Sequence, residues 1–175
     1  TGFNKNEECE TNVNLFASEK ELENDLIKVT FNEDGTISSV YDKVNEREAI
    51  DNNQAGNRLT VYEDTGDAWD IPINYDEKEP DMFKLDSVEA FVDGPKAVIT
   101  QVYRYYNSKL EQEISLTAGS SRIDFETVVD WQEEHKMLRT SFPVNVFTRK
   151  ATCDIQFGSI KRPTHRNTSW DMAKF

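Results

Sequence analysis

Apolar residues recur at every second position in a series of short runs, and turn-forming residues separate these runs. A period of two is typical of half-buried β-strands. The pattern predicts strands over residues 84–92, 97–106, 110–116, 123–129, 136–147 and 151–160. Gly, Asn, Pro and Ser lie between most of these runs and suit tight turns. Strands at intervals of about 8 to 12 residues, with almost no helical period, predict an all-β antiparallel sandwich.

The first part of the chain predicts a hairpin of the same sandwich. Alternating apolar residues in 23–32 and 36–41 flank an Asp34-Gly35 turn, which supplies a positive-φ position. A short helical turn is expected around 47–50, and Pro143 is expected to bend its strand or place it at a sheet edge. We expect a linker or lead-in strand over 1–22 and a β-sandwich domain over 23–175. No capping or Gly-rich tail closes either end, so we expect part of a longer polypeptide.

The net charge and the cysteine content limit which partners and which cellular compartment we expect. The chain has 33 acidic and 20 basic residues, a net charge of -13, which disfavours nucleic acid and anionic membranes as partners. Its two cysteines, Cys9 and Cys153, do not form a disulfide framework, although one bridge between them stays open. A reduced, cytoplasmic setting is the simplest interpretation. No apolar run reaches the roughly 18 residues of a membrane span.

The chain lacks the motifs of a self-sufficient catalytic or metal centre. His135 and His165, the only histidines, are 30 positions apart, and no paired cysteines accompany them, so we expect no zinc site and no cofactor within this chain. Asp67 and Asp70 lack the spacing of a calcium-binding loop. Neither a nucleophile elbow nor a Gly-rich phosphate loop is present.

An acidic and aromatic stretch at 59–75 is the first candidate binding segment. It begins like a strand, continues through carboxylates that surround one indole, and ends in a second strand-like piece at 71–75. Carboxylates accept hydrogen bonds from hydroxyls, and a flat ring covers the apolar face of a sugar. The candidate sugar-binding residues are Asp67, Trp69 and Asp70. An acidic loop anchored by a buried Trp69 is the alternative.

The second candidate segment is the polar stretch 158–175, which is rich in hydrogen-bond donors. A loop with several donors and one stacking ring suits a ligand cleft. The candidate residues are His165, Asn167, Trp170 and Asp171. A surface loop with Trp170 tucked in as an anchor is the alternative.

Three ordered segments resemble the α-mannosidases of glycoside hydrolase family 38, of the bacterial and cytosolic type. They are YEDTGDAWDIP at 62–72, WQEEHKMLRTSFPV at 131–144 and QFGSIKRPTHRNTSWDMAKF at 156–175. One departure is visible, because only Thr65 and Gly66 separate YED from DAWD. Members of the family often have several residues there, including an extra Trp.

The resemblance implies a retaining glycoside hydrolase that acts on α-mannosides. It places a divalent metal, usually zinc, and an Asp nucleophile in an N-terminal catalytic domain that is absent from this chain. This chain resembles the C-terminal β-domain, a large antiparallel supersandwich like the galactose mutarotase fold. In the family that domain packs on the catalytic domain and closes one side of the sugar cleft. The two candidate segments are then expected near the rim of the cleft.

Two other functions stay open. A stand-alone carbohydrate-binding module would use Trp69 and Trp170 with their flanking aspartates. An aldose epimerase of the mutarotase type would need a His acid and a Glu base facing one cleft. The expected partners are an α-mannoside and the N-terminal catalytic domain of the same polypeptide, and an apolar docking face left exposed would favour a homo-oligomer.

Overall fold

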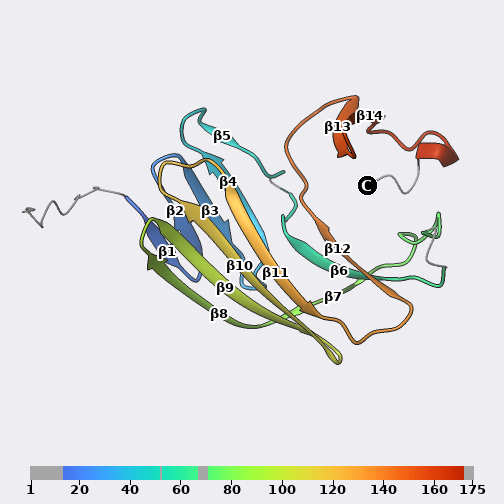
Figure 1. The fold of residues 1–175 in the computed structure, drawn as a ribbon, viewed down its shortest axis with the longest axis horizontal. Helices are drawn as coiled ribbons and strands as arrows, with labels where there is room; N and C mark the ends of the chain where they lie inside the picture. Colours follow the sequence, from blue (N-terminus) through green and yellow to red (C-terminus); the bar gives the residue numbers. More distant parts are fainter. Residues whose placement is uncertain (1–13, 52, 67–70, 172–175) are drawn as a thin grey trace, which may run out of the picture.

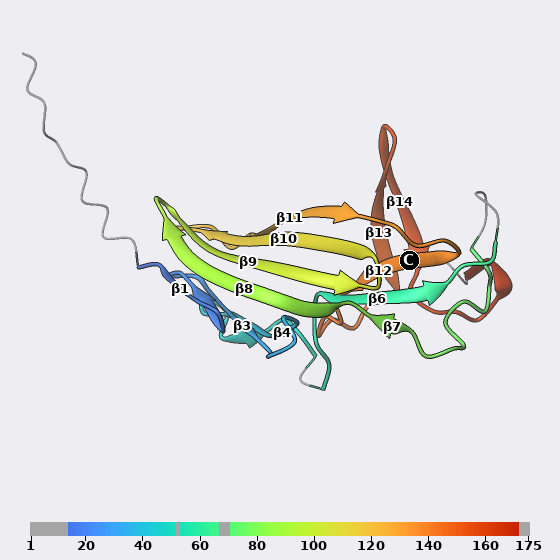
Figure 2. The same ribbon diagram turned by 90° about the horizontal axis from the view of Figure 1, so that it is seen from below.

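A computed structural model describes residues 14–51, 53–66 and 71–171, and shows an all-β sandwich. One layer is a five-stranded antiparallel sheet in the order β1-β2-β3-β4-β5. The other layer is a four-stranded antiparallel sheet in the order β11-β10-β9-β8, and Figures 1 and 2 show the two layers. The first sheet contains β1 (Phe16–Ser18), β2 (Glu21–Glu23), β3 (Ile27–Phe31), β4 (Ile37–Asp42) and β5 (Arg47–Glu48). The second contains β8 (Lys84–Asp93), β9 (Lys96–Tyr105), β10 (Ser108–Thr117) and β11 (Ile123–Asp130).

The main core lies between these two layers. Alternation along β9 and β10 sends one set of side chains inward, and the register pairs Ile99 with Ile114 on that face. From the other sheet, Leu22 and Val29 are fully buried against them. The predicted period of two therefore places every second side chain of these strands between the two sheets, where it is buried away from water.

A second, smaller unit extends from one end of the sandwich. It is a three-stranded sheet in the order β12-β6-β7, formed by β12 (Lys136–Ser141), β6 (Arg58–Glu63) and β7 (Asp81–Met82). Its buried side chains form a separate cluster with residues at the end of β9 and the start of β10, on either side of the β9–β10 turn. The cluster contains Leu59, Val61, Phe83, Tyr103, Tyr105 and Leu110. The long strands β9 and β10 thus serve both cores and fix the two units to each other.

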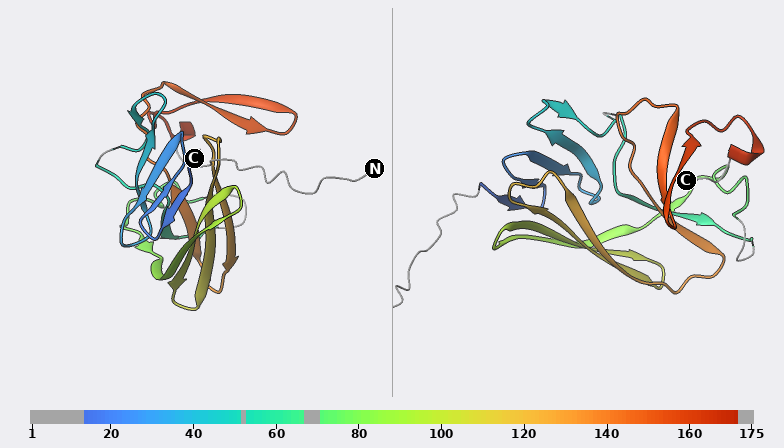
Figure 3. Two further views of the ribbon diagram at one scale, coloured as in Figure 1. Left: turned by 90° about the vertical axis from the view of Figure 1, so that its left-hand side faces the viewer. Right: turned by 45° about the horizontal axis from the view of Figure 1, so that its top comes forward.

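The last part of the chain stands apart from both units. Strands β13 (Lys150–Ile155) and β14 (Gly158–Pro163) pair only with each other among the described residues. Figures 2 and 3 show this ribbon projecting from the sandwich. A short 3-10 turn, η1 (Ser169–Asp171), follows.

The prediction of an all-β antiparallel sandwich is confirmed. The four long strands β8 to β11 fall on the four runs predicted between 84 and 129. Gly35 has a φ of 82°, as the Asp34-Gly35 turn predicted. Strand β12 ends at Ser141, just before Pro143, which lacks the amide hydrogen that a continuing ladder needs.

Three local predictions are wrong. Residues 47–50 do not form a helical turn, because β5 pairs with β4 and Ile50 bridges to Val144. The piece 71–75 is a turn, in which the Tyr75 amide donates to the Pro72 carbonyl at 3.0 Å. The single strand expected over 151–160 is a hairpin of β13 and β14. Within the expected linker or lead-in strand 1–22, residues 16–18 and 21–22 belong to β1 and β2 of the five-stranded sheet.

Candidate functional site

The structure brings the C-terminal segment 164–171 against the loop that follows β6. The guanidinium of Arg166 forms an ion pair with the carboxylate of Asp76. Both segments lie at the end of the molecule opposite β1, as Figures 1 and 2 show. Two stretches that are about 90 residues apart in sequence therefore form one surface.

Aromatic contacts hold the loop after β6 in place. The ring of Tyr75 meets the ring of Tyr62 edge-on, with centroids 5.2 Å apart. The guanidinium of Arg139 lies 4.9 Å from the centre of the Tyr75 ring and donates a hydrogen bond to its hydroxyl. Tyr75 is buried, so this loop is anchored on β6 and β12 rather than on the sandwich core.

Asp171 organises the C-terminal segment. Its carboxylate accepts a hydrogen bond from the Thr168 hydroxyl at 2.8 Å and lies 3.4 Å from Nδ1 of His165. The Asp171 amide donates to the Thr168 carbonyl at 2.9 Å, which closes the 3-10 turn. The side chain of Asp171 is only 10% exposed, whereas that of His165 is 50% exposed. Asp171 therefore positions the turn, and His165 stays half-exposed to solvent.

Trp170 is the exposed feature of this segment. The residue is 87% exposed, so the alternative in which its ring is a tucked-in anchor is wrong within this chain. Asn167, three residues earlier, is also exposed. An uncovered indole beside a His, an Asn and an ordered carboxylate can stack on a sugar ring and hydrogen-bond its hydroxyls.

The first candidate segment is only partly covered by the structure. Asp67, Trp69 and Asp70 lie outside the described residues, so their proposed role stays a prediction. The chain just before them is held to residue His135, which precedes β12, because the Asp64 amide donates to the His135 carbonyl at 2.9 Å. Lys78 contacts Glu63 at 2.6 Å, and this hydrogen bond holds the pKa of the Glu63 carboxyl below its ordinary value.

The described residues do not fit a metal. Within 14–51, 53–66 and 71–171, no group of three or more His, Cys, Asp or Glu side chains is placed to hold an ion. His165 and Asp171 make a pair, which is fewer than the three protein ligands of catalytic zinc sites.

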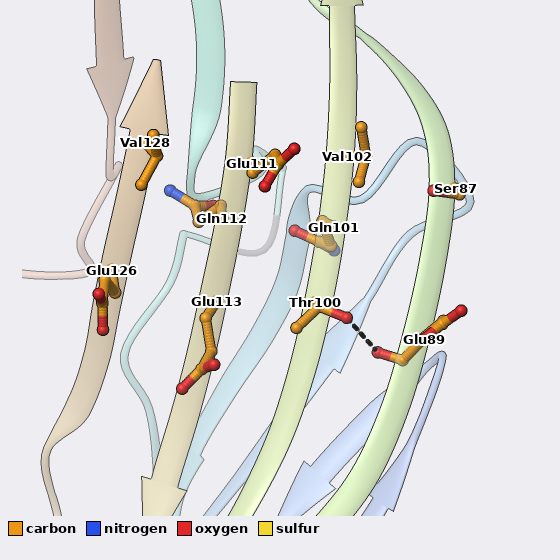
Figure 4. A pocket seen from close by; sticks show the side chains of 10 residues that line it. All are labelled: Ser87, Glu89, Thr100, Gln101, Val102, Glu111, Gln112, Glu113, Glu126 and Val128. Carbon is orange, nitrogen blue, oxygen red and sulfur yellow. Dashed lines mark hydrogen bonds between the residues drawn. The ribbon is translucent and has the colours of Figure 1, made fainter. Parts of the chain in front are cut away.

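Sequence reasoning missed a carboxylate-lined hollow of about 430 Å³ on the outer face of the four-stranded sheet. Figure 4 shows its side chains rising from neighbouring strands, including Glu89, Glu111, Glu113 and Glu126. The only sequence signal was the pair Glu111 and Glu113 on the polar face of β10; the others come from β8 and β11. No buried side-chain atom there lacks a hydrogen-bond partner, and the hollow has no aromatic wall, so we assign it no role.

None of the helical segments in the described part of the chain has the length and apolar character to cross a membrane.

Comparison with known proteins finds relatives named alpha-mannosidase. Alpha-mannosidase G of Dictyostelium discoideum is 38% identical over 166 residues, covering 88% of this chain and 15% of that protein. Alpha-mannosidase 2C1 of Homo sapiens is 35% identical over 162 residues, covering 88% and 15%. The chain thus spans about 15% of the length of these relatives.

Structural comparison extends the likeness to the fold. The crystal structure of an alpha-mannosidase from Enterococcus faecalis V583 matches with a TM-score of 0.71 at 16% identity, covering 91% of this chain and 21% of that one. At this low sequence identity, the match shows only that the two chains share a fold. The glycosyl hydrolases family 38 C-terminal domain matches residues 22–175. This match runs from β2 through the segment that carries Trp170, and the chain therefore belongs to the family of glycosyl hydrolase family 38 C-terminal domains.

Proposed function

We propose that this chain is the non-catalytic β-sandwich domain of a retaining α-mannosidase that removes terminal α-D-mannosyl residues from glycans. The family match over residues 22–175 carries this proposal, and the relatives named alpha-mannosidase support it. The nucleophile, the acid/base group and the divalent metal, which we expect to be zinc, would then lie in a catalytic domain elsewhere in the same polypeptide. A cytoplasmic location is part of the proposal.

An exposed apolar strip supports the expected packing on a catalytic domain. The strip comprises Phe125, Phe142, Val144, Val146 and Phe147, which are 36%, 42%, 55%, 55% and 97% exposed. The rings of Phe125 and Phe142 contact each other edge-on at 5.4 Å between centroids. Four of the five residues lie between positions 142 and 147, and exposed apolar side chains grouped in this way are typical of interaction sites. A second copy of the chain is the other occupant that would bury it.

The surface around Trp170 is our candidate for the sugar cleft. Trp170 would stack on a sugar ring, and His165, Asn167 and Asp171 would contact hydroxyls directly or order the turn. Asp67, Trp69 and Asp70 are proposed to join them, because Asp76, six residues after Asp70 in the sequence, forms an ion pair with Arg166 of this segment.

Trp170→Ala in the longer polypeptide tests this assignment. Loss of a stacking ring should raise KM for a mannoside about tenfold, since such contacts contribute roughly 1 kcal/mol or more. The melting temperature should stay unchanged, because the ring is exposed within this domain. Phe16→Ala, on β1 at the opposite end of the molecule and 51% exposed, is the matched control and should leave KM unaltered. Unchanged KM in Trp170→Ala would remove Trp170 from the cleft.

One observation favours a second candidate, the carbohydrate-binding module. Trp170 is exposed without any catalytic domain present, so the chain alone could bind sugar. The structure gives less support to the epimerase candidate, which needs a Glu base beside its His acid. The carboxylate beside His165 belongs to Asp171, and it already accepts a hydrogen bond from Thr168. The family match favours the mannosidase domain over both.

A further inference from the structure

The tip of the β9–β10 hairpin carries an exposed tyrosine in an unfavourable backbone conformation. Tyr105 pairs with Ser108, so Tyr106 and Asn107 form a two-residue turn. Tyr106 has a φ of 45° and is 80% exposed. Positive φ at such a turn normally selects Gly, Asn or Asp, and a bulky residue there costs stability. An apolar ring held in solvent on a strained backbone is typical of a contact surface.

Neighbouring groups hold this tip rigidly. The carboxylate of Glu133 accepts hydrogen bonds from the Asn107 amide at 3.1 Å and from the Ser108 hydroxyl at 2.9 Å. The ring of Tyr105 meets the Tyr106 ring edge-on, with centroids 4.8 Å apart and planes at 83°. The Tyr105 hydroxyl in turn donates to Asp81 at 2.7 Å. Tyr106 is therefore preorganised, which lowers the entropy cost of binding.

A hollow of about 490 Å³ opens beside Tyr106. Its lining residues are Asp81, Met82, Lys84, Arg104, Tyr105 and Tyr106. This volume is within the roughly 300–1,000 Å³ of small-molecule sites. The hollow combines hydrogen-bond donors, an acceptor and a stacking ring, which is the combination that a polyol needs.

The charges around the hollow favour a neutral ligand. Lys84 and Arg104 bring two positive charges to it, and Asp81 brings one negative charge. Asp86 lies 2.9 Å from Nε of Arg104 and offsets the second positive charge. A phosphate or another anion would meet no net positive field here. Lys84 is exposed and forms no ion pair within the described part of the chain, so its ammonium is available to a hydroxyl.

We propose that Tyr106, Lys84 and Asp81 form a binding subsite for a neutral glycan, separate from the surface around Trp170. A sugar ring would stack on Tyr106, while Lys84 donates to its hydroxyls and Asp81 accepts from them. The choice of glycan as ligand rests on the proposed function. The subsite would hold a distal part of a long substrate, so it should affect polymeric mannosides and leave aryl mannosides unaffected.

Tyr106→Asn in the 175-residue chain is the sharpest test, because Asn accepts positive φ and so removes the ring without disturbing the turn. We expect soluble α-mannan to retard the unaltered chain in affinity electrophoresis. Tyr106→Asn should weaken this interaction about fivefold or more, and its melting temperature should equal or exceed that of the unaltered chain. Lys84→Met should weaken binding as well.

Two controls separate this subsite from other surfaces. Phe157 is fully exposed at a φ of 61° in the β13–β14 turn and lines neither the hollow at Tyr106 nor the one over β10, so Phe157→Asn should leave mannan binding unchanged. In a Trp170→Ala background, Tyr106→Asn should still weaken mannan binding, because the two surfaces are separate. Equal retardation of Tyr106→Asn and the unaltered chain would overturn the proposal, and so would the absence of any retardation by mannan. Neither outcome bears on hydrolysis by the longer polypeptide, which tests the proposed function separately.

Discussion

Gly35 shows how one residue can join the two layers of the sandwich. Its carbonyl accepts a hydrogen bond from the Gln101 side chain at 3.1 Å, and Gln101 accepts one from the Tyr103 hydroxyl at 2.8 Å. A Cβ added at Gly35 would overlap the Tyr103 hydroxyl oxygen and lie 3.0 Å from its Cζ. The turn between β3 and β4 therefore sits directly on the inner face of β9.

Gly35→Ala should lower the free energy of unfolding by about 2–4 kcal/mol, because a left-handed backbone and an overpacked contact both carry a cost. Urea denaturation followed by tryptophan fluorescence measures this change. Gly94→Ala is the matched control, since Gly94 also has positive φ but has open space beside it, and it should lose only about 1 kcal/mol. Equal losses in the two variants would show that the Tyr103 contact has no energetic role.

At this scale, prediction from sequence succeeded where the chemistry is local. The Asp34-Gly35 pair specifies a positive-φ turn by itself. Trp170 could not be assigned, because its exposure depends on which other segment lies over it. The subsite at Tyr106 could not be predicted, because the sequence places this tyrosine in a strand. Its lining residues come from β7, β8, β9 and the β9–β10 turn.

Among the strands, the short β5 is held to β4 by one carboxylate. Glu48 accepts hydrogen bonds from the Ser39 hydroxyl at 2.5 Å, the Val40 amide at 2.8 Å and the Ile50 amide at 3.0 Å. Burial opposes its ionisation, but these hydrogen bonds outweigh burial and hold the pKa of Glu48 below its ordinary value of 4.5. A lowered folded-state pKa means that ionised Glu48 stabilises the fold.

This stabilisation should be complete above the unfolded-state value of about 4.5 and should disappear as the pH falls through the lower folded-state pKa. Glu48→Gln should therefore destabilise the chain by about 1–2 kcal/mol at pH 7, and the difference from the unaltered chain should shrink below pH 4.5. Denaturant unfolding at several pH values checks both points. A difference that is constant with pH would mean that the charge of Glu48 contributes nothing.

Element length decided which strands could be predicted. Strands β8 to β11 have 8 to 10 residues each, which is long enough to show a period of two. Strands β5 and β7 have two residues each and show no period at all. The β13–β14 hairpin was missed because its turn consists of Gln156 and Phe157, with Phe157 at positive φ, and neither residue is typical of a turn.

For the whole molecule, the two candidate segments and the apolar strip define where partners are expected. The sandwich is built from contacts within the chain, whereas the β13–β14 ribbon, Trp170 and the strip around Phe142 are left largely uncovered. An isolated two-stranded ribbon has marginal stability in water, so we expect the catalytic domain to cover it. Sequence patterns predicted the class of fold, but they could not predict these surfaces, which depend on how distant elements meet.

Hydrolysis of an aryl α-mannoside is the most direct test, measured for the 175-residue chain and for the longer polypeptide, each with and without added zinc. We predict no hydrolysis by the chain alone under either condition. The longer polypeptide should hydrolyse the α-mannoside, and it should lose most of this activity when residues 22–175 are deleted. Metal-dependent hydrolysis by the 175-residue chain would contradict a supporting role. An inactive longer polypeptide, across a panel of aryl glycosides, would contradict the assignment as an α-mannosidase.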